Sequence, residues 1–526
     1  MASMNHLIHD SLFESADRTP AAEALVYGDA RCSYAQLAAQ VHAVGALLLR
    51  SGLEPGARVA VYMEKRIENV AAMFGAAAAG CVFVPVNPLL KAEQVAYILA
   101  DCNVRLLVTT AERLAQLAPV LGRCPDLRAV LLTDGAAASA FDALPVLAWP
   151  TSADKDAAAA PHRRIDTDVA AILYTSGSTG QPKGVVLSHR NMVAGAQSVA
   201  SYLDLRADDR LLAVLPLSFD YGLSQLTTAF LRGASVVLMN YLFPKDIVAM
   251  VARERITGLA AVPPLWIALA RLAWPAGCTL RFITNSGGAM PVPTVQALRE
   301  ALPDTQIFLM YGLTEAFRST YLPPSEVARR PDSIGRAIPN AEILVVRPDG
   351  TLCDADEPGE LVHRGALVAL GYWNDPARTA QRFRPAPGQD AGLPVPELAV
   401  WSGDNVRRDA EGYLYFIGRS DDMIKVSGYR ISPTEIESVL HETGLVAEVA
   451  AFGIDHPQLG QAIAVIAVPA EEGVVDAAAL LAECKRHLPA YMVPARVDLH
   501  TGPLPRNPNG KIDRNLLRQT LQTNEA

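Results

Sequence analysis

The densest cluster of glycine and hydroxyl residues in the sequence is the segment YTSGSTGQPKG, residues 174–184. Its three glycines permit backbone conformations that a β-carbon forbids, so successive amide N–H groups can point at one anion. Lys183 supplies a positive charge, and hydroxyl groups supply further donors. The hydroxyl residues are Thr175, Ser176, Ser178 and Thr179, and the glycines are Gly177, Gly180 and Gly184. This combination predicts a loop that binds the phosphates of a nucleotide.

The spacing of this segment is not that of a Walker A loop, which requires GxxxxGK followed by Ser or Thr. Here Lys183 lies between Pro182 and Gly184, and the proline disfavours a helix that begins at the lysine. A flexible linker is the other interpretation, but apolar runs flank the segment, VAAILY before it and VVL after it. We therefore expect an anion-binding loop of a kind other than a P-loop.

Four further motifs follow in order: YGLTE at 311–315, WSGD at 401–404, GRSDDMIK at 418–425 and NPNGK at 507–511. Together with the glycine-rich loop, this series resembles the signature motifs of the AMP-forming adenylating ligases, the superfamily of acyl-CoA synthetases, peptide-synthetase adenylation domains and luciferase. The resemblance extends over essentially the whole chain. It implies that the protein uses ATP to activate a carboxylic acid as an acyl-adenylate, releases pyrophosphate and transfers the acyl group to a thiol.

That reaction joins two anions, so the protein must neutralise their charge and align them. Magnesium on the phosphates is the simplest aid, and a carboxylate must hold it. The resemblance implies that Glu315 is this magnesium ligand and that Thr314 lies near the α-phosphate. Outside such a motif, a glutamate at this position would be interpreted as a charge in the first turn of a helix.

The resemblance also implies the residues around the nucleoside. Asp404 would accept hydrogen bonds from both ribose hydroxyls, for which paired carboxylate oxygens are suited. Arg419 would contact ribose or phosphate. Tyr311 and Phe416 would lie beside the adenine, although the sequence alone makes Phe416 only a core residue of a strand.

Lys511 lies in a Pro-Asn-Gly turn, where a lysine would ordinarily be a solvated surface charge. The resemblance implies instead that it reaches from a small C-terminal domain into the active site and contacts the carboxylate and the α-phosphate. It also implies that this domain rotates between adenylate formation and thioester formation, and that Gly428 lets a pantetheine arm pass close to the backbone. The residues implied for the hinge and the thioester step are Asp421, Lys425, Gly428 and Arg430.

The segment PLSFDYGLSQ, residues 216–225, has Asp220 where many fatty-acyl and aryl-CoA ligases have a histidine. In this it resembles amino-acid-activating domains, whose aspartate pairs with the α-ammonium group of the substrate. A buried carboxylate is costly without a cation, so a cationic substrate would explain it. The other interpretation, a capping or turn residue after Phe219, stays open. We expect the acid to be an amino acid or a related polar acid.

The resemblance places a mixed lining around that acid, which disfavours a long fatty chain. Arg318 would face either a second acidic group on the substrate or solvent. The segment around Asp220 is most similar to stand-alone ligases, such as prolyl-carrier-protein ligases and the AMP-forming ligases associated with exosortase systems. The implied lining residues are Asp220, Tyr221, Ser224, Leu265, Thr284, Ser286, Gly287, Met310, Arg318 and Ser319.

Alternating helices and strands must position these motifs. Apolar residues at helical spacing in 34–51 and 92–101 alternate with short apolar strands at 58–63 and 105–109. This pattern is typical of βαβ units on a mostly parallel sheet. Residues 136–168, rich in Ala, Pro and Asp, are expected to form a loop or linker.

The length of 526 residues exceeds that of one hydrophobic core and would accommodate about three to four domains. The motifs reduce this to two expected domains: an N-terminal AMP-binding domain, residues 1–420, and a C-terminal domain, residues 421–526, which carries Lys511. The expected fold class is α/β. It comprises a large N-terminal body of mostly parallel α/β subdomains with a small β-barrel-like part, and a small mobile α+β C-terminal domain.

Composition excludes other classes of protein. Hydrophobic residues make up 50% of the chain and charged residues 19%, which excludes a disordered chain. A net charge of −9 gives no reason to expect nucleic acid as a partner. Seven dispersed cysteines without a CxxC pair argue against structural zinc and a disulfide framework. The apolar run at 71–86 is too short to span a membrane, and the N-terminus lacks the features of a secretory signal, so we expect a cytoplasmic protein.

No carrier-protein serine motif follows Lys511. The expected acceptor thiol is therefore coenzyme A or the phosphopantetheine of a separate carrier protein, and the expected cofactors are ATP and Mg²⁺. Two alternatives stay open. One is a conventional acyl-CoA or aryl-CoA ligase in which Asp220 is incidental, and the other is a non-catalytic nucleotide-binding protein.

Overall fold

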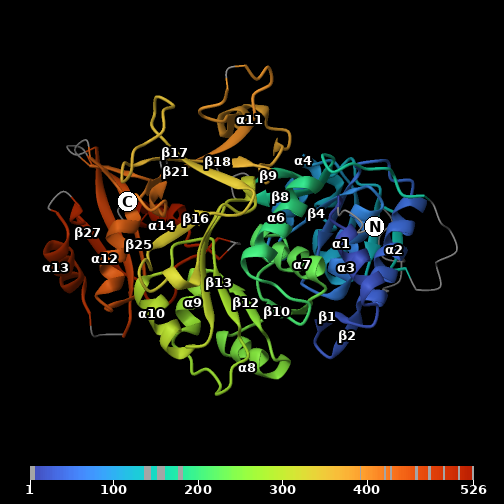
Figure 1. The fold of residues 1–526 in the computed structure, drawn as a ribbon, viewed down its shortest axis with the longest axis horizontal. Coiled ribbons are helices and arrows are strands. Elements are labelled where there is room, and N and C mark those ends of the chain that lie inside the picture. The colour runs from blue at the N-terminus through green and yellow to red at the C-terminus, as the bar shows by residue number, and fades with distance from the viewer. Residues whose placement is uncertain are drawn as a thin grey trace.

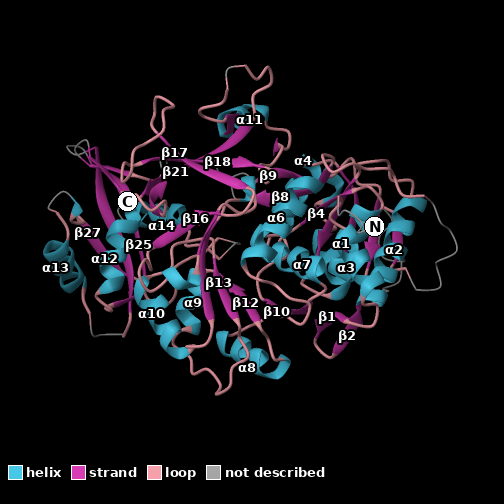
Figure 2. Ribbon diagram, in the orientation of Figure 1, coloured by secondary structure: helices cyan, strands magenta, loops and turns pink. Residues whose placement is uncertain are grey.

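Three β-sheets organise the residues that the structure describes, and helices pack against them (Figure 1 and Figure 2). The structure is a computed structural model of the chain. It describes residues 6–134, 144–150, 160–175, 182–390, 392–419, 422–426, 429–456, 460–471, 475–489, 492–507 and 510–523. In Figure 1 the chain runs from the N-terminal part on the right, through the centre, to the C-terminal part on the left.

The first sheet belongs to the N-terminal part and has eight strands in the order β19-β9-β8-β4-β3-β5-β6-β7. Strands β3 to β8 run parallel, whereas β9 and β19 are antiparallel at one edge. The strands are β3 (Arg58–Tyr62), β4 (Val82–Pro85), β5 (Val104–Thr109), β6 (Ala129–Leu132), β7 (Val146–Ala148), β8 (Val169–Thr175), β9 (Lys183–Ser188) and β19 (Gly371–Tyr372). The helices between and beside them are α2 (Tyr34–Arg50), α3 (Ile67–Ala78), α4 (Ala92–Asp101), α5 (Ala111–Leu117) and α6 (His189–Tyr202).

Small residues allow helices α2 and α3 to pack closely. Nine of the twelve residues of α3 are buried, and its sequence, IENVAAMFGAAA, is rich in alanine. A β-carbon on Gly75 would lie 2.7 Å from Val44 Cγ1 of α2, so only glycine fits this contact. Helix α2 begins after Ser33, which forms a capping box with Gln36.

The second sheet has fourteen strands and crosses the centre of the molecule. Its parallel part has the order β14-β13-β12-β10-β11-β1, and antiparallel strands extend both ends. The strands of the parallel part and its edge are β1 (Glu23–Tyr27), β2 (Ala30–Ser33), β10 (Arg210–Ala213), β11 (Ser235–Leu238), β12 (Gly258–Ala261), β13 (Phe282–Asn285) and β14 (Gln306–Tyr311). The associated helices are α1 (Asp10–Arg18), α7 (Asp220–Arg232), α8 (Pro244–Glu254), α9 (Pro263–Leu269) and α10 (Val292–Ala301).

The antiparallel strands after β14 continue the same sheet within the N-terminal body, for which the sequence predicts a small β-barrel-like part without placing it. These strands are β15 (Thr320–Leu322), β16 (Ser333–Ala337), β17 (Ala341–Val346), β18 (Gly359–Gly365), β20 (Phe383–Pro385), β21 (Leu398–Arg408) and β22 (Leu414–Arg419), with α11 (Pro376–Arg382) between β19 and β20. Because β21 pairs with β22, residues of the WSGD and GRSDD motifs face each other across one ladder.

The third sheet forms a small C-terminal domain of mixed α/β structure, on the left in Figure 1. Helices α12 and α13 cover one apolar cluster of this domain, and α14 covers another. The elements are β23 (Ile424–Val426), β24 (Tyr429–Ile431), α12 (Pro433–Glu442), β25 (Val446–His456), β26 (Gly460–Pro469), α13 (Ala477–His487), β27 (Arg496–Leu499) and α14 (Arg514–Thr523). The large N-terminal domain and this small one are the two domains of the fold.

The observed elements agree with the alternating pattern of the sequence. The helices expected at 34–51 and 92–101 are α2 and α4, and the strands expected at 58–63 and 105–109 are β3 and β5. One expectation is wrong in part. The segment 136–168 contains β7, which forms a parallel strand at the edge of the first sheet and pairs with β6, with Val146 opposite Val130. A three-residue strand at a sheet edge has too few residues to give a detectable period.

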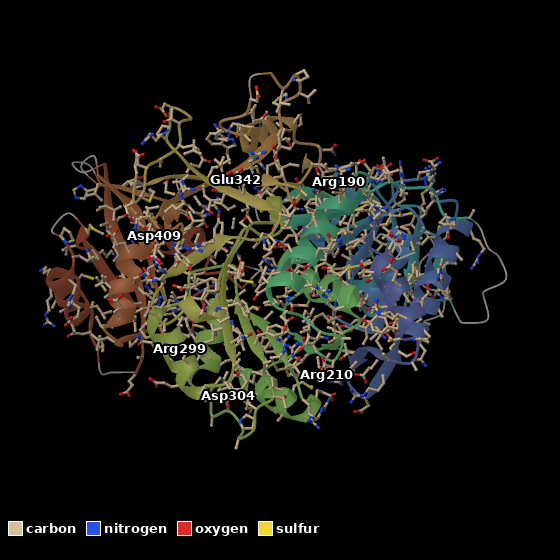
Figure 3. All side chains as sticks on the ribbon, in the orientation of Figure 1. Arg190, Arg210, Arg299, Asp304, Glu342 and Asp409 are labelled. Atoms are coloured by element: carbon tan, nitrogen blue, oxygen red, sulfur yellow. The ribbon has the colours of Figure 1, made fainter. Side chains whose placement is uncertain are left out.

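Ion pairs join segments that are distant in the sequence, and Figure 3 labels Arg210 and Asp409, which take part in such pairs. Arg210 pairs with Glu23 and with Glu254 at 2.8 Å, so it joins β10 to β1 and to the end of α8. Asp409 pairs with Arg330 near the antiparallel strands. Of the helices that the structure describes, none combines the length and apolar character of a membrane span.

Candidate functional site

Lys183, Glu315 and Tyr372 form a closed group of hydrogen bonds. Lys183 Nζ lies 2.8 Å from both Glu315 Oε1 and Tyr372 Oη, and the tyrosine hydroxyl donates to the same carboxylate oxygen at 2.6 Å. Lys183 is the first residue of β9, and the pairing of β9 with β19 brings Tyr372 beside it. Glu315 lies in a short turn, Thr314–Ala316, which follows β14.

The Glu315 carboxylate is buried but ionised. Burial raises its pKa, but the charge of Lys183 and the hydrogen bonds from Lys183 and Tyr372 outweigh this and lower the pKa of Glu315 to about 2. Arg382 of α11 adds a further favourable charge. Burial and the nearby carboxylate raise the pKa of Tyr372, so its hydroxyl stays protonated and donates.

A single carboxylate of this kind suits a magnesium ion that is shared with phosphates. The described residues contain no group of three His, Cys, Asp or Glu side chains that could enclose a metal. Mg²⁺ is commonly bound by one or two carboxylates, with substrate phosphates and water as its remaining ligands. Glu315 therefore fits a magnesium ion that arrives with a nucleotide.

Asp404 lies at the ladder between β21 and β22, where it is backbone-paired with Arg419. The Tyr311 hydroxyl donates to Asp404 Oδ2, and Arg419 Nε lies 3.4 Å from Oδ1. Oδ1 is buried and accepts no hydrogen bond from the residues that the structure describes. Burial raises the pKa of Asp404, whereas Arg419 and Tyr311 lower it in part. Its unused acceptor suits a hydroxyl group of a ligand.

Tyr311 and Phe416 place two aromatic rings beside Asp404. Their centroids are 6.4 Å apart and their planes are tilted by 35°. Thr175, at the end of β8, has a buried hydroxyl oxygen without a partner among the described residues. The rest of the glycine-rich loop lies outside the described residues, including Ser176, Gly177, Ser178, Thr179 and Gly180.

The glycine-rich segment joins two antiparallel strands. Tyr174 of β8 pairs with Gly184 of β9, and Thr175 pairs with Lys183. A Walker A loop instead precedes a helix, so the prediction from Pro182 is confirmed: a strand begins at Lys183.

Asp220 is the first residue of α7, and its side chain is buried against charged and polar groups. Thr314 Oγ1 donates to Asp220 Oδ1 at 3.2 Å, and Arg318 Nη1 lies 3.7 Å from Oδ2. Burial raises the pKa of Asp220, and Arg318, Thr314 and Lys511 counteract the increase. The residue is thus part of a buried polar cluster and does not act as a solvent-exposed cap.

Arg318 does not face solvent, because only 1% of its surface is exposed. Its Nη2 lies 3.4 Å from Ser224 Oγ, and its guanidinium carbon lies 4.5 Å from the ring centroid of Tyr221. The Tyr221 hydroxyl is in turn 2.5 Å from Thr284 Oγ1. The structure therefore brings five of the expected lining residues together, with Asp220 among them.

The other expected lining residues have different surroundings. Met310 Sδ accepts a hydrogen bond from Tyr202 at 3.0 Å, and Ser319 Oγ is 2.9 Å from His363 Nδ1. Ser286 is buried, and the adjacent Gly287 has a φ of +86°. Leu265 is a core residue at the start of α9.

Lys511 comes from the C-terminal domain but lies beside residues of the N-terminal domain. Its Cε is 3.9 Å from the position that a β-carbon on Gly287 would occupy. Desolvation lowers the pKa of Lys511, while Asp220, Asp404 and Glu315 partly offset the decrease. The side chain is nevertheless solvent-exposed. Lys511 thus lies among charged residues of the large domain while part of its surface stays open to solvent.

The residues expected at the hinge cannot be placed in the same detail. Asp421 and Gly428 lie outside the described residues, as do the side chains of Lys425 and Arg430, whose backbones pair between β23 and β24. Arg419, at the end of β22, is the last described residue before the small domain.

Two residues of the site were not expected from the sequence, Tyr372 and Arg382. Tyr372 is 189 positions from Lys183, and it reaches the lysine through a two-residue strand. Arg382 Nη1 donates to the backbone oxygen of Trp401 at 2.9 Å, which holds it near the WSGD motif. The segment GYW before Asn374 offered no distinctive signal, because the same Gly-Tyr pair also occurs at 412–413 and 428–429.

Comparisons with known proteins agree with this arrangement. A family model described as "AMP-binding enzyme" matches residues 12–373, and one described as "AMP-binding enzyme C-terminal domain" matches residues 435–511. The L-proline–L-prolyl-carrier protein ligase of Pseudomonas fluorescens is 30% identical, over 98% of this chain and 99% of that protein. Tyrocidine synthase 3 of Brevibacillus parabrevis is 31% identical over 99% of this chain, which spans 8% of the length of that synthase.

Among solved structures, an anthranilate CoA ligase in complex with anthranoyl-AMP has a TM-score of 0.87. It is 26% identical in sequence, and the match covers 98% of each chain.

Proposed function

The chain belongs to the AMP-binding enzyme family, and from this premise we propose that it is an ATP-dependent ligase that activates a carboxylic acid as an acyl-adenylate and transfers it to a thiol. One observation carries the proposal. Lys511 of the small domain reaches the large domain, where its Cε lies 3.9 Å from the position that a β-carbon on Gly287 would occupy and the charges of Asp220, Asp404 and Glu315 favour its ammonium form. The attack of a carboxylate on an α-phosphate requires a cation at such a place, between Asp220 at the acid site, Asp404 at the ribose-hydroxyl site and Glu315 at the magnesium site.

We assign the nucleotide to the groups with unused bonding capacity. Asp404 Oδ1 and Thr175 Oγ1 are buried oxygens that form no hydrogen bond with the described residues, although Arg419 lies 3.4 Å from Asp404 Oδ1. In the proposal, Asp404 binds the ribose hydroxyls, and Tyr311 and Phe416 lie beside the adenine. The phosphates bind to residues 175–180 and Lys183, and Arg419 contacts ribose or phosphate.

Glu315 is the proposed magnesium ligand. When bound, the ion supplies positive charge to the phosphates and to the pyrophosphate that leaves. The group formed by Lys183, Glu315 and Tyr372 keeps the carboxylate ionised in the absence of the metal.

Thr314 and Lys511 would act at the reacting atoms. Thr314 precedes Glu315 and donates to Asp220, so its hydroxyl lies between the metal ligand and the acid site. Lys511 would contact both the attacking carboxylate and the α-phosphate, and would stabilise the charge that develops between them.

Asp220 supports an amino acid or related polar acid as the substrate. Its carboxylate is buried, so a cationic substrate group would lower the cost of its ionisation. The similar ligase of Pseudomonas fluorescens is named for L-proline. A conventional aryl-CoA ligase is the second candidate, because Arg318 already places a cation 3.7 Å from Asp220.

The second half-reaction requires a thiol, either that of coenzyme A or that of a carrier protein's phosphopantetheine. We propose two working domains, residues 1–420 and 421–526, with Asp421 as the hinge between their two arrangements. Gly428 would then let the pantetheine arm pass close to the backbone with the help of Arg430, and Lys425 belongs to the same boundary.

All seven cysteines are free. Because free thiols persist in reducing compartments, we propose a cytoplasmic location.

The test is ATP–pyrophosphate exchange with a panel of amino acids, aryl acids and aliphatic acids. Thioester formation is then measured with coenzyme A and with a phosphopantetheinylated carrier protein. Exchange that depends on a particular acid supports the proposal. Binding of ATP without exchange for any acid would instead indicate a non-catalytic nucleotide-binding protein.

A further inference from the structure

Arg318 is a buried cation with few bonding partners. A guanidinium group has five N–H donors and is costly to bury unless they are used. Arg318 Nε is buried and donates to no residue that the structure describes. The contacts of the other two nitrogens are long, 3.4 Å from Nη2 to Ser224 Oγ and 3.7 Å from Nη1 to Asp220 Oδ2.

The pair with Asp220 does not satisfy either residue. An arginine and a carboxylate that neutralise each other usually form two parallel hydrogen bonds of about 2.8 Å. Here the closest approach is 3.7 Å, and the hydrogen bond to Asp220 comes from Thr314. The separation therefore leaves hydrogen-bonding capacity on the guanidinium group of Arg318.

The pair also lies next to the reacting centre. Thr314 joins Asp220 to the turn that carries Glu315, and Lys511 contributes to the field at Asp220. Thr314 contacts Oδ1 of Asp220, whereas Arg318 approaches Oδ2 and has Ser224 and Tyr221 beside it. An acid whose carboxylate is at Lys511 would therefore meet Asp220 first and Arg318 next.

We propose that Arg318 determines specificity by binding an oxygen acceptor on the side chain of the acid, while Asp220 binds its ammonium group. The inference rests on the proposed function and names its substrate class. Asp220 and Arg318 together are neutral, so an ammonium group alone would leave one uncompensated positive charge. A second carboxylate restores neutrality, which makes an amino dicarboxylic acid the favoured substrate, with its amide as the uncharged variant of the same chemistry.

The test uses sets of acids that share a shape but differ in the terminal group. Aspartate, asparagine and leucine form one such set. Glutamate and 2-aminoadipate, each with its amide and its hydrocarbon analogue, extend the series to longer chains. Pyrophosphate exchange is measured for the wild type, Arg318→Met and Arg318→Lys. Arg50→Met, at the exposed end of α2, is the matched surface control.

In the wild type and the Arg50→Met control, we expect the best acid of a set to exceed its hydrocarbon analogue by at least about 100-fold in kcat/KM. Arg318→Met should reduce that ratio to less than about tenfold, and Arg318→Lys should give an intermediate ratio because it keeps the charge but loses the planar fork. The ranking of carboxylate over amide tests the charge argument separately. A wild type that prefers the amide would overturn the assignment of a dicarboxylic acid.

A double variant guards against indirect effects of the unpaired aspartate. Arg318→Met leaves Asp220 buried without its cation, whereas Asp220→Asn with Arg318→Met removes both charges. We expect the double variant also to lack the preference for an acceptor, and ATP binding, measured by calorimetry, shows that each variant is folded. If the ratio of kcat/KM between the best acid and its hydrocarbon analogue is unchanged in both the single and the double variant, the inference is overturned.

The same experiment separates this inference from the proposed function. A wild type that exchanges best with an aryl or aliphatic acid lacking a second acceptor, and whose ratios within each set are unchanged in Arg318→Met, would leave the ligase function intact and refute the role of Arg318. Exchange with no acid at all, despite ATP binding, would refute the proposed function itself.

Discussion

Lys183 Nζ lies 2.8 Å from Glu315 Oε1. The lysine thus occupies the place beside the carboxylate that the metal ion of a bound nucleotide would need. Tyr372 bonds to both groups, and the lysine also lies 4.3 Å from the centroid of its ring. When ATP and magnesium bind as proposed, Lys183 must turn towards phosphate while the metal takes its place at the carboxylate. The ionised state of Glu315 is thus prepared before the metal arrives.

Replacement of Glu315 by Gln should reduce pyrophosphate exchange by on the order of 10²–10³, because an electrostatic contact to the reacting phosphates is lost. The magnesium concentration that gives half-maximal exchange should rise as well. Glu342→Gln, at an exposed carboxylate of β17 (Figure 3), is the control and should behave as the wild type. An unchanged magnesium dependence in Glu315→Gln would argue against its role as a ligand.

Asp404→Asn should weaken the interaction of the protein with the ribose hydroxyls of ATP. A hydrogen bond to a charged group contributes about 1.5–3 kcal/mol, so kcat/KM for ATP should fall by about 10- to 150-fold. The wild type should discriminate against 2′-deoxy-ATP and 3′-deoxy-ATP, and the variant should discriminate less. If Asp404→Asn keeps the full discrimination, another residue binds the ribose hydroxyls.

Much of the fold could be predicted from the sequence, because helices such as α2 bury apolar residues at helical spacing and strands such as β3 are short apolar runs that are buried almost throughout. The motifs assigned Lys183 and Glu315 to one nucleotide site, although they did not predict the direct contact between the two side chains. Resemblance also indicated that Lys511 belongs near the nucleotide, although its turn alone suggests a surface charge.

Other features depend on tertiary pairing that no local pattern carries. Tyr372 enters the site because a two-residue strand pairs with β9. The burial of Arg318 could not be predicted, since an arginine in the segment AFRST could equally point outward. Its environment is set by α7, which begins 98 residues earlier in the chain (318 − 220).

Asp421→Pro should separate the two half-reactions. Proline fixes φ near −65° and would restrict the backbone rotation proposed between β22 and β23. Pyrophosphate exchange should remain within a few-fold of the wild type, whereas thioester formation, which requires the rotation, should fall by roughly tenfold or more. Asp421→Ala, which leaves rotation free, is the control. Equal rates of thioester formation in the two variants would exclude this hinge.

His363 should make the protein less stable in acid. It is completely buried, and burial lowers its pKa to about 3, whereas an unfolded histidine titrates near 6.5. Between these values the unfolded chain binds the proton more readily, so stability falls as the pH falls below 6.5 and is unaffected above it. From pH 7 to pH 5 this histidine should cost roughly 2 kcal/mol of unfolding free energy.

Denaturant unfolding at these two pH values tests the assignment. The difference should shrink in His363→Gln and stay unchanged in His487→Gln, a half-exposed histidine of α13. An equal acid sensitivity in His363→Gln and the wild type would assign the effect to other groups.

Lys511→Ala should abolish adenylate formation selectively. Loss of one group that stabilises transition-state charge costs about 3–4 kcal/mol, or 10²–10³ in rate. Pyrophosphate exchange should fall by this factor, while transfer to the thiol from a supplied acyl-adenylate should stay largely intact. A similar loss in both half-reactions would place Lys511 in binding or folding instead.

The lowered pKa of Lys511 gives this prediction a signature in pH. The ammonium form is required, and desolvation lowers its pKa, so exchange should decline as the pH rises at values below the ordinary lysine pKa of about 10.4. Lys511→Arg keeps its charge throughout this range because the arginine pKa exceeds 12. Residual exchange in Lys511→Arg should therefore lack the alkaline decline, and the same decline in both proteins would assign the titration to a different group.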